Sequence, residues 1–393
     1  MSKVQCVIGA MYGDEGKGLM TDYFASQHIP DVVVIRYNSS AQAGHTVVCP
    51  GKIRHVFSHF GSGSFAMRPT ILSEHFVVHP VLFKKEYQEF RKKALLCTPK
   101  VYVHTDCMVT TPYEMIINQI IENRRGKDRH GSVGIGFGET FERQCYMTLH
   151  VSDLFGDKDD LRQKLMLIRD RWVPSRIQDC QSEDEQRLFE ALNSDIMLDN
   201  FMEDCNFFIN TVFELDYEQF QHCDLIFEGA QGLMLDQTFG FFPHVTRSNT
   251  GLKNIIEVLK NFTVDELKVN HISRAYTTRH GAGPLEFEMD FPNHIIDNTN
   301  HSHIFQGSLR YSPLNVDDLH DVITKDYESV KDLHSYDIID EVTITCLDQL
   351  LDEVSFINNG KLQIMTKDKF LGGIKQTSTY TSFGPTREHI LKV

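Results

Sequence analysis

Short apolar runs alternate along the chain with longer stretches in which apolar and polar residues recur at helical spacing. Four apolar runs are rich in β-branched residues and end in glycine-rich or polar loops: residues 4–10, 31–37, 223–228 and 342–346. Runs of this length are typical of strands buried on both faces. Residues 80–93 and 112–124 each begin with proline and end in basic residues, as helices do. Strands that alternate with helices predict an α/β fold with a largely parallel sheet.

Residues 156–220 interrupt this alternation. They are rich in charged residues, mostly helical in pattern, and contain the only tryptophan of the chain, Trp172. The length of 393 residues and the hydrophobic content of 41% allow one elaborate domain or two coupled ones. We interpret residues 156–220 as a helical insertion carried by the sheet domain.

Charge and cysteine usage exclude several classes of protein. The chain has 39 Lys and Arg against 54 Asp and Glu, a formal charge of −15, so we expect neither nucleic acid nor an anionic membrane as a partner. No apolar run reaches the roughly 18–20 residues of a spanning helix, and the first ten residues resemble a strand more than a signal peptide. The nine cysteines are irregularly spaced and form no CxxC pair, which indicates free thiols in a reducing cytoplasm.

The loop after the first predicted strand, Gly13 to Gly18, reads GDEGKG and precedes a predicted helix. Its glycines allow backbone amides to close around an anion, and Lys17 supplies a positive charge for phosphate. Gly18 stands where a standard phosphate-binding loop has the Ser or Thr that holds magnesium. Asp14 is therefore a candidate metal ligand or base. The alternative is a tight turn with solvated charges.

The loop after the second predicted strand, residues 38–46, surrounds one histidine, His45, with small residues. A single histidine is more often structural than catalytic. Its position after a strand, at the same sheet edge as Asp14, favours the catalytic interpretation. The two groups titrate on opposite sides of neutrality, so Asp14 and His45 form a sensible acid and base pair.

Three further loops carry candidate chemistry. Gln231 in FEGAQG presents an amide to a base edge, and the Thr, Ser and Asn residues at 246–250 suit a phosphate or sugar, although both could be ordinary polar turns. Arg279 lies beside two glycines in AYTTRHGAGP and suits an oxyanion. Asp348, which follows a predicted strand, could accept two hydrogens from guanine or cap a helix.

The order of these motifs resembles the adenylosuccinate synthetase family, which joins aspartate to a 6-oxopurine nucleotide at the expense of GTP. The resemblance extends over residues 4–389 and is loose at 156–220 and 290–330. It rests on GDEGKG, RYNSSAQAGHT, SVGIGFGETFE, FEGAQGLMLDQTFGFFPHVTRSNT, AYTTRHGAGP, TCLD and SFGPTRE. It implies one α/β domain over residues 1–393 and a homodimer.

The resemblance also implies roles for individual residues. Asp14 removes the N1 proton and holds Mg²⁺ together with the Gly44 carbonyl, His45 stabilises the charge that develops during phosphoryl transfer, and Lys17 and Gln231 complete the catalytic set. The donor nucleotide and its phosphates contact Gly13, Glu15, Gly16, Lys17, Gly18, Gly44, His45, Thr46, Asp348, Ser382 and Gly384. The substrate nucleotide contacts Asn38, Gln42, Ser132, Val133, Gln231 and Thr246. Aspartate contacts Thr278, Arg279 and Arg310.

The chain departs from the family pattern in its substrate pockets. Gln42 replaces an asparagine, Val133 replaces a threonine that contacts phosphate, and the arginine that a partner subunit contributes falls near Met147. Of the arginine-rich loop that grips aspartate, only Arg310 is alignable. Cys346 replaces the lysine that covers the donor base. The phosphoryl-transfer residues are intact, which predicts retained chemistry on altered substrates.

Several alternatives therefore stay open. IMP is the family's default substrate, and dGMP is that of a viral subgroup with 2-aminoadenine DNA. The amine could differ from aspartate, and the donor could be GTP, ATP or dATP. A nucleotide-binding regulator without turnover is the alternative from a different class.

Overall fold

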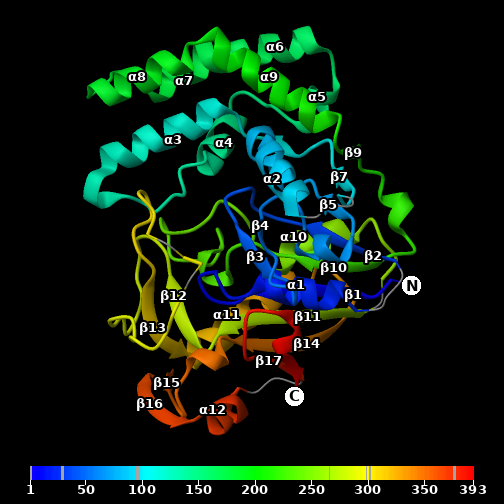
Figure 1. Cartoon of the computed structure of the whole chain (residues 1–393), viewed down its shortest axis with the longest axis vertical. Helices are drawn as coiled ribbons and strands as arrows, with labels where there is room; N and C mark the ends of the chain where they lie inside the picture. Colours follow the sequence, from blue (N-terminus) through cyan, green and yellow to red (C-terminus); the bar gives the residue numbers. More distant parts are fainter. Residues whose placement is uncertain are drawn as a thin grey trace.

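The computed structural model describes residues 2–27, 31–93, 98–264, 266–297, 299–300, 302–374 and 378–393. Within them, ten strands form one sheet with helices on both faces (Figure 1). In order across the sheet, the strands are β18 (Ile390–Lys392), β17 (Ser378–Ser382), β14 (Asp337–Thr345), β11 (Glu266–Arg274), β1 (Val4–Gly9), β10 (Asp224–Glu228), β2 (Val32–Arg36), β5 (Thr70–Leu72), β7 (Val101–Val103) and β9 (Phe213–Glu214). Neighbouring strands are parallel except for β17 and β18. The predicted α/β class with a mainly parallel sheet is confirmed.

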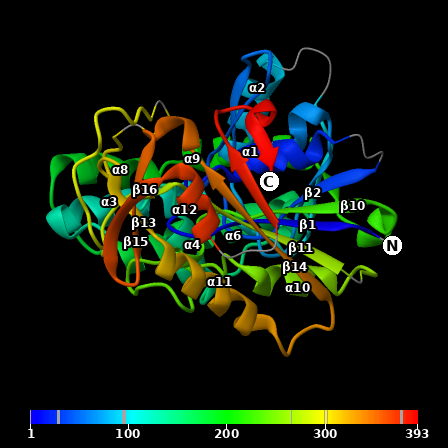
Figure 2. The same ribbon diagram turned by 90° about the horizontal axis from the view of Figure 1, so that it is seen from below.

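The four predicted apolar runs all belong to this sheet, as β1, β2, β10 and the end of β14. Successive residues of a strand point to opposite faces. In β1, Cys6 and Ile8 pack in the cluster of α10 (Leu252–Leu259) and α11 (Val316–Val330), whereas Val7 packs in the cluster of α1 (Lys17–Ala25). Figure 2 shows α1 on one face of the sheet and α10 and α11 on the other. This two-sided burial explains why the strands read as continuous apolar runs.

Two central strands carry more polar residues than the pattern predicted. β14 begins at Asp337 instead of residue 342. The earlier start was not predicted because Asp337 and Asp340 interrupt the apolar run and none of the first four residues is fully buried. β11 is buried almost throughout but contains Asn270 and His271. Thr343 donates a hydrogen bond to Asn270 at 2.7 Å, and His271 faces Asp326 at 3.3 Å. Partners from neighbouring elements thus allow these polar side chains to be buried.

The predicted helices at 80–93 and 112–124 form α2 (Pro80–Lys93) and α3 (Pro112–Arg125). The predicted helical insertion contains α6 (Lys158–Leu167), α7 (Val173–Arg176), α8 (Glu183–Leu192) and α9 (Asp195–Ile209). These helices gather with α5 (Val151–Phe155) at one end of the molecule and share an apolar core with α2 and α3 (Figure 1). The region also contains β9, which pairs with β7 and was missed because its two residues are exposed.

A second sheet lies beyond β11 in the order β12 (Tyr276–Arg279), β13 (Arg310–Asn315), β15 (Glu353–Asn358) and β16 (Lys361–Thr366). Shorter pairs are β3 (His45–Val48) with β4 (Arg54–Phe57), and β6 (Val77–Val78) with β8 (Met108–Val109). The remaining helices are α4 (Phe137–Gln144) and α12 (Lys367–Gly373).

Two further predictions concern the oxidation state of the cysteines and helices that could span a membrane. The cysteines within the described ranges are free thiols, and Cys97 lies outside those ranges. A search of the described helices finds none whose length and apolar content would let it cross a membrane.

Candidate active site

The loops that follow β1, β10 and β14 meet at the carboxyl edge of the main sheet. A Cβ added to Gly13 would lie 3.7 Å from the Cα of Gln231, so the loops after β1 and β10 are in contact. The Thr345 hydroxyl, at the end of β14, donates to the Glu15 carbonyl at 2.9 Å. Ligands of open α/β sheets bind at this edge.

The loop before α1 is built from left-handed backbone. Gly13 and Gly16 have φ of 93° and 97°, and Asp14 between them has φ of 57°. Gly16 caps α1 without a side chain, so no side chain covers the first amides of the helix at Lys17 and Gly18. This backbone is compatible with the predicted anion site, which stays a prediction.

The resemblance implies that Glu15 contacts the donor nucleotide. Its carboxylate, however, lies inside this loop and does not face outward. Its side chain is 3% exposed, accepts hydrogen bonds from the amides of Met11 (2.6 Å) and Gly13 (3.2 Å), and lies 3.9 Å from Nζ of Lys17. A Cβ on Gly9 would come within 2.4 Å of the carboxylate, so only glycine fits there. Burial raises the pKa of Glu15 to about 7 and lowers the pKa of Lys17. Glu15 thus shapes the loop from within.

His45, the first residue of β3, is buried against the start of α1. Its Nδ1 lies 2.5 Å from Oε1 of Glu228, the last residue of β10. A carboxylate only accepts hydrogen bonds, so Nδ1 carries the hydrogen. Nε2 is buried and has no hydrogen-bond partner in the described part of the chain. A Cβ on Gly18 would lie 3.0 Å from the Cβ of His45 and 3.2 Å from the Thr46 carbonyl, which places the histidine beside the phosphate loop.

Glu228 is a site residue that sequence reasoning missed. It is fully buried and also accepts hydrogen bonds from the backbone amide of Ser62 at 2.9 Å and from the Ser62 hydroxyl. Burial opposes its ionisation, but His45 and Arg36 outweigh burial and lower the pKa of Glu228. Burial lowers the pKa of His45, and Glu228 offsets this only in part. The available signal was an acidic residue that ends an apolar strand, because such a residue requires a partner.

Asp14 and His45 have different partners and do not pair with each other. The Asp14 side chain is 35% exposed, and its Oδ2 lies 3.3 Å from Nε2 of His280. Its backbone carbonyl accepts a hydrogen bond from Nε of Arg274 at 2.5 Å. A carboxylate that is still accessible remains available to a ligand or a metal ion.

The candidate substrate residues of the second and third loops are linked to each other. The side-chain amide of Asn38 is buried. Its oxygen accepts from the Ala230 amide at 2.9 Å and its nitrogen donates to the Ala230 carbonyl at 3.0 Å, which fixes the turn before Gln231. Nε2 of Gln42 donates to the hydroxyl of Thr246 at 3.4 Å. The Asn38 side chain is therefore hydrogen-bonded within the protein, whereas Gln42 and Thr246 are only half-buried.

Ser132 and Val133 lie in the loop before α4. Ser132 donates to Oδ1 of Asn118 at 2.7 Å and accepts from the amide of Gly134 at 3.1 Å. Gly131 packs against Gly281, since a Cβ on Gly131 would lie 2.8 Å from the Gly281 Cα. The fold thus brings this loop to the AYTTRHGAGP segment.

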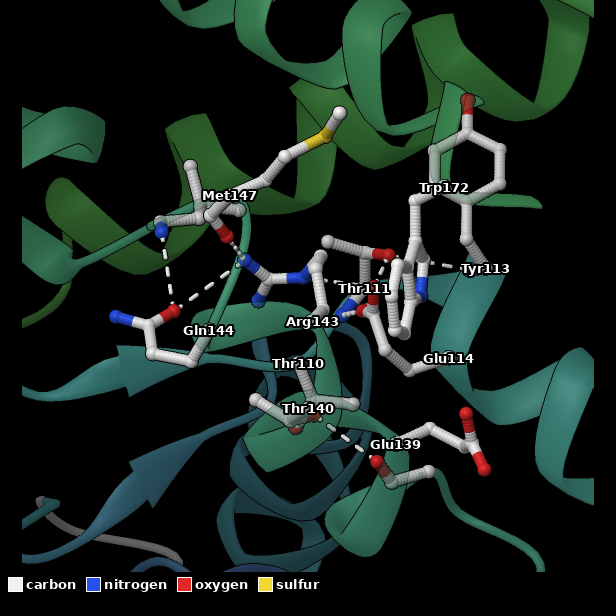
Figure 3. Close-up of polar contacts among 12 residues, drawn as sticks. Thr110, Thr111, Tyr113, Glu114, Glu139, Thr140, Arg143, Gln144, Met147 and Trp172 are labelled. Carbon is white, nitrogen blue, oxygen red and sulfur yellow. Dashed lines mark hydrogen bonds and ion pairs between the residues drawn. The ribbon is translucent and has the colours of Figure 1, made fainter. Parts of the chain in front are cut away.

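Arg143, the arginine nearest to Met147, is engaged within the protein (Figure 3). It and Glu114 are both completely buried and form an ion pair of 2.8 Å. Arg143 also donates to the carbonyls of Val109 (2.7 Å) and Met147 (2.6 Å). The Glu114 carboxylate in turn accepts from the amide and hydroxyl of Thr111 at 2.7 and 2.6 Å. Arg143 therefore joins α3, α4 and β8 and does not supply the missing phosphate contact.

The three candidate aspartate ligands are also buried or occupied. Arg310 is bound by Glu288 and donates to the carbonyls of Gly281 (3.1 Å) and Gly283 (2.8 Å). Arg279 is 2% exposed and donates to the carbonyls of Pro284 (2.7 Å) and His244 (3.3 Å).

One nitrogen of Arg279 nevertheless has no hydrogen-bond partner among the described residues. Its guanidinium lies 4.5 Å from the ring centre of Tyr12, and its Nε is buried without a partner among the described residues. The hydroxyl of Thr278 is also buried and has no hydrogen-bond partner among the described residues. Recognition of an anion here therefore requires some of the existing hydrogen bonds to be exchanged.

The candidate donor-base residues lie at the ends of β14 and β17. Asp348 is exposed within a short 3₁₀ turn, Leu347–Gln349, and the cap position belongs to Cys346 with φ of 61°. The helix-cap alternative for Asp348 is therefore wrong. The Ser382 hydroxyl is buried and donates to the Gly384 carbonyl at 2.9 Å.

The residues present fit a magnesium ion that is completed by phosphate. Mg²⁺ is usually held by one or two protein carboxylates together with phosphate oxygens and water. No cluster of three or more His, Cys, Asp or Glu side chains suited to a metal occurs among the residues described. The accessible carboxylate of Asp14 can supply such a ligand, and Gly44 is exposed as well.

Comparison with known proteins identifies relatives of the chain. A family profile described as adenylosuccinate synthetase matches residues 6–310. The chain is 30% identical over 294 residues to adenylosuccinate synthetase of Acaryochloris marina, covering 72% of this chain and 62% of the relative. It is 30% identical over 308 residues to that of Wigglesworthia glossinidia brevipalpis, covering 76% and 67%. The chain thus spans less than two thirds of the first relative's length.

Solved structures show the same fold. A fully ligated adenylosuccinate synthetase from Plasmodium falciparum aligns with a TM-score of 0.71 and 19% identity over all of both chains. Succinoaminodeoxyadenylate synthetase (PurZ) of cyanophage S-2L, described as bound to dGMP and to dATP as an energy donor, aligns with a TM-score of 0.64 and 17% identity over 100% of this chain and 95% of that one. From the profile match over more than half of its length, this chain belongs to the adenylosuccinate synthetase family.

Proposed function

We propose that this chain is a carbon–nitrogen ligase that joins aspartate to C6 of a 6-oxopurine nucleotide through a 6-phosphoryl intermediate. A purine nucleoside triphosphate drives the reaction. The observation that carries the proposal is the meeting of Lys17, the His45–Glu228 pair and Gln231 at one sheet edge. Family membership supports the same reaction.

The reaction divides into two steps. In the first, Asp14 takes the N1 proton of the purine while O6 attacks the γ-phosphorus and the nucleoside diphosphate leaves. Lys17 and the loop amides position the phosphoryl group. In the free protein the hydrogen of His45 is on Nδ1, so His45 takes up a second proton at Nε2 beside the phosphate and stabilises the developing charge as an imidazolium. Asp14 and the Gly44 carbonyl would hold Mg²⁺, which would neutralise phosphate charge. In the second step, the amine attacks C6, inorganic phosphate leaves with the C–O bonding electrons, and the amine nitrogen gives its extra proton to the departing phosphate.

IMP is the first candidate substrate, and dGMP is the second. Val133 offers no hydroxyl to a substrate phosphate, and Arg143 is bound to Glu114 and to backbone carbonyls, so the phosphate pocket differs from that implied by the family. The cyanophage relative, whose fold this chain shares, is described as bound to dGMP and dATP. These observations favour a test of both nucleotides.

The remaining binding roles follow the family pattern. Gln42, Ser132, Gln231 and Thr246 face the substrate nucleotide, and Asp348 the donor base, which is guanine or adenine. Aspartate is the amine, although Arg279 and Arg310 must exchange internal hydrogen bonds to bind it. We also propose a cytoplasmic homodimer without nucleic acid or membrane partners.

A matrix assay tests the proposal. Purified protein receives IMP, dIMP, GMP or dGMP with GTP, ATP or dATP and Mg²⁺, with and without aspartate, and phosphate release is followed. We expect aspartate-dependent release with one oxopurine, and a loss of about 10² to 10⁴ in rate for Asp14→Asn. Release that is equally fast in folded Asp14→Asn contradicts the role of Asp14. No release in any combination favours a regulator without turnover, and release with glycine or ammonia but not aspartate refutes the choice of amine.

A further inference from the structure

Arg274 and His280 contact Asp14, whose backbone has a left-handed conformation. Its φ of 57° is left-handed, a conformation that a non-glycine residue keeps only where its surroundings hold it. Arg274 donates from Nε to its carbonyl at 2.5 Å, and His280 lies 3.3 Å from its carboxylate. Because the carboxylate is partly exposed, its direction depends on such contacts.

Arg274 is itself fixed by a partly buried acid, Asp297. Its side chain is 8% exposed, and NH1 lies 3.1 Å from Oδ2 of Asp297. The Asp297 carboxylate also accepts from the amides of Thr299 (2.8 Å) and Asn300 (3.0 Å). Burial alone would raise the pKa of Asp297, but Arg274 and the hydrogen bonds of Asn300 and Thr299 lower it to about 2. Asp297 is thus a permanent anion behind Arg274.

His280 contacts the Asp14 carboxylate and is connected to Asp297 through Asn300. Nδ2 of Asn300 donates to Oδ2 of Asp297 at 2.8 Å, which leaves Oδ1 of Asn300 facing Nε2 of His280 at 3.3 Å. Nε2 therefore faces two acceptors, the Asn300 oxygen and the Asp14 carboxylate, and must carry the hydrogen. The result is a closed ring in which each member contacts the next: Asp297, Arg274, Asp14, His280, Asn300 and again Asp297.

We propose that this ring positions Asp14 for the reaction, with His280 and Arg274 as positioning residues and Asp297 as their common anchor. The inference rests on the proposed function, in which Asp14 contacts the purine. Arg274 holds the backbone of Asp14 in its left-handed state, and His280 selects the direction of its carboxylate. The ring therefore links the phosphate loop to the end of β11, to His280 after β12, and to Asp297 and Asn300.

The first experiment compares His280→Ala, His280→Gln and a matched exposed control, His222→Ala, in the phosphate-release assay. His280→Ala should lower kcat by roughly 10- to 100-fold, the scale of a misplaced catalytic group, with little change in the KM of the donor. His280→Gln should recover most of kcat, because its Nε2 can donate to Asp14. Unchanged turnover in His280→Ala, or no recovery in His280→Gln, would overturn the role of His280.

The second experiment does not need turnover. Asp297→Asn removes the anion behind Arg274, so backbone amides of residues 13–16 should exchange with deuterium faster than in the parent protein, while those of β1 stay protected. Equal exchange at residues 13–16 would overturn the ring as the support of the loop. If the parent protein released no phosphate but this difference appeared, the proposed function would fail and the ring would stand.

Discussion

Nδ1 of His45 and Oε1 of Glu228 lie 2.5 Å apart, although 183 positions separate the two residues in the chain. The pair joins the start of β3 to the end of β10 and keeps a hydrogen on Nδ1 of His45. The other nitrogen, Nε2, is thereby left for a ligand. The orientation of the proposed catalytic histidine thus depends on a residue with no direct contact to the reacting atoms.

Glu228→Gln should lower kcat by about 10² while the protein remains folded. The amide cannot stabilise an imidazolium, and its NH₂ group can turn toward Nδ1 and reverse the tautomer. Phosphate release with the substrate found in the matrix assay measures the effect, with near-ultraviolet circular dichroism as the control for folding. Glu228→Asp should retain more activity than Glu228→Gln; the reverse order would contradict a charge-dependent role.

His45→Asn should slow phosphoryl transfer far more than it weakens nucleotide binding. A group that stabilises developing charge acts in the transition state, so kcat should fall by at least about 10² while KM changes little. Steady-state kinetics with varied donor and substrate give both constants. A rise in KM without a fall in kcat would make His45 a binding residue.

Arg143→Met should destabilise the fold by roughly 3–5 kcal/mol, because it leaves the buried carboxylate of Glu114 without its cation. Urea unfolding measures the change. Arg162→Met, which breaks the exposed pair with Asp199, is the control and should cost no more than about 1 kcal/mol. Similar effects of the two substitutions would show that Arg143 is not structural.

Stability should fall as the pH rises above 6.5, the ordinary pKa of histidine. Burial would lower the pKa of His271, but the nearby carboxylates of Asp326 and Asp340 outweigh burial and raise it. A raised pKa means that the stabilising contribution is complete below 6.5 and is lost as the pH passes the folded-state value. Urea unfolding between pH 6 and 9 should show a flatter profile for His271→Asn. Identical profiles would assign the pH dependence to other groups.

Donor choice should be less strict than in the family at large. Cys346 stands where the family has a lysine over the base, while the exposed Asp348 can still accept from guanine. We expect measurable turnover with both GTP and an adenine nucleotide, and a shift toward GTP in Cys346→Lys. A preference of the parent protein for GTP of a hundredfold or more would contradict this.

The sequence by itself determined the strands at residues 4–9 and 32–36, the helices at 80–93 and 112–125, and the loops that carry Lys17, His45 and Gln231. These features are local. A strand buried on both faces is apolar throughout, and a parallel strand must end in a loop at the shared carboxyl edge.

Only the tertiary structure decided the partners of these residues. Glu15 turns into its own loop, His45 pairs with Glu228, and Arg310 is already bound to Glu288. Which acid meets which base depends on contacts between positions that are distant in the chain. Motif spacing records only that a charged residue is present, whereas burial requires that charge to be paired, and packing determines the residue that does so.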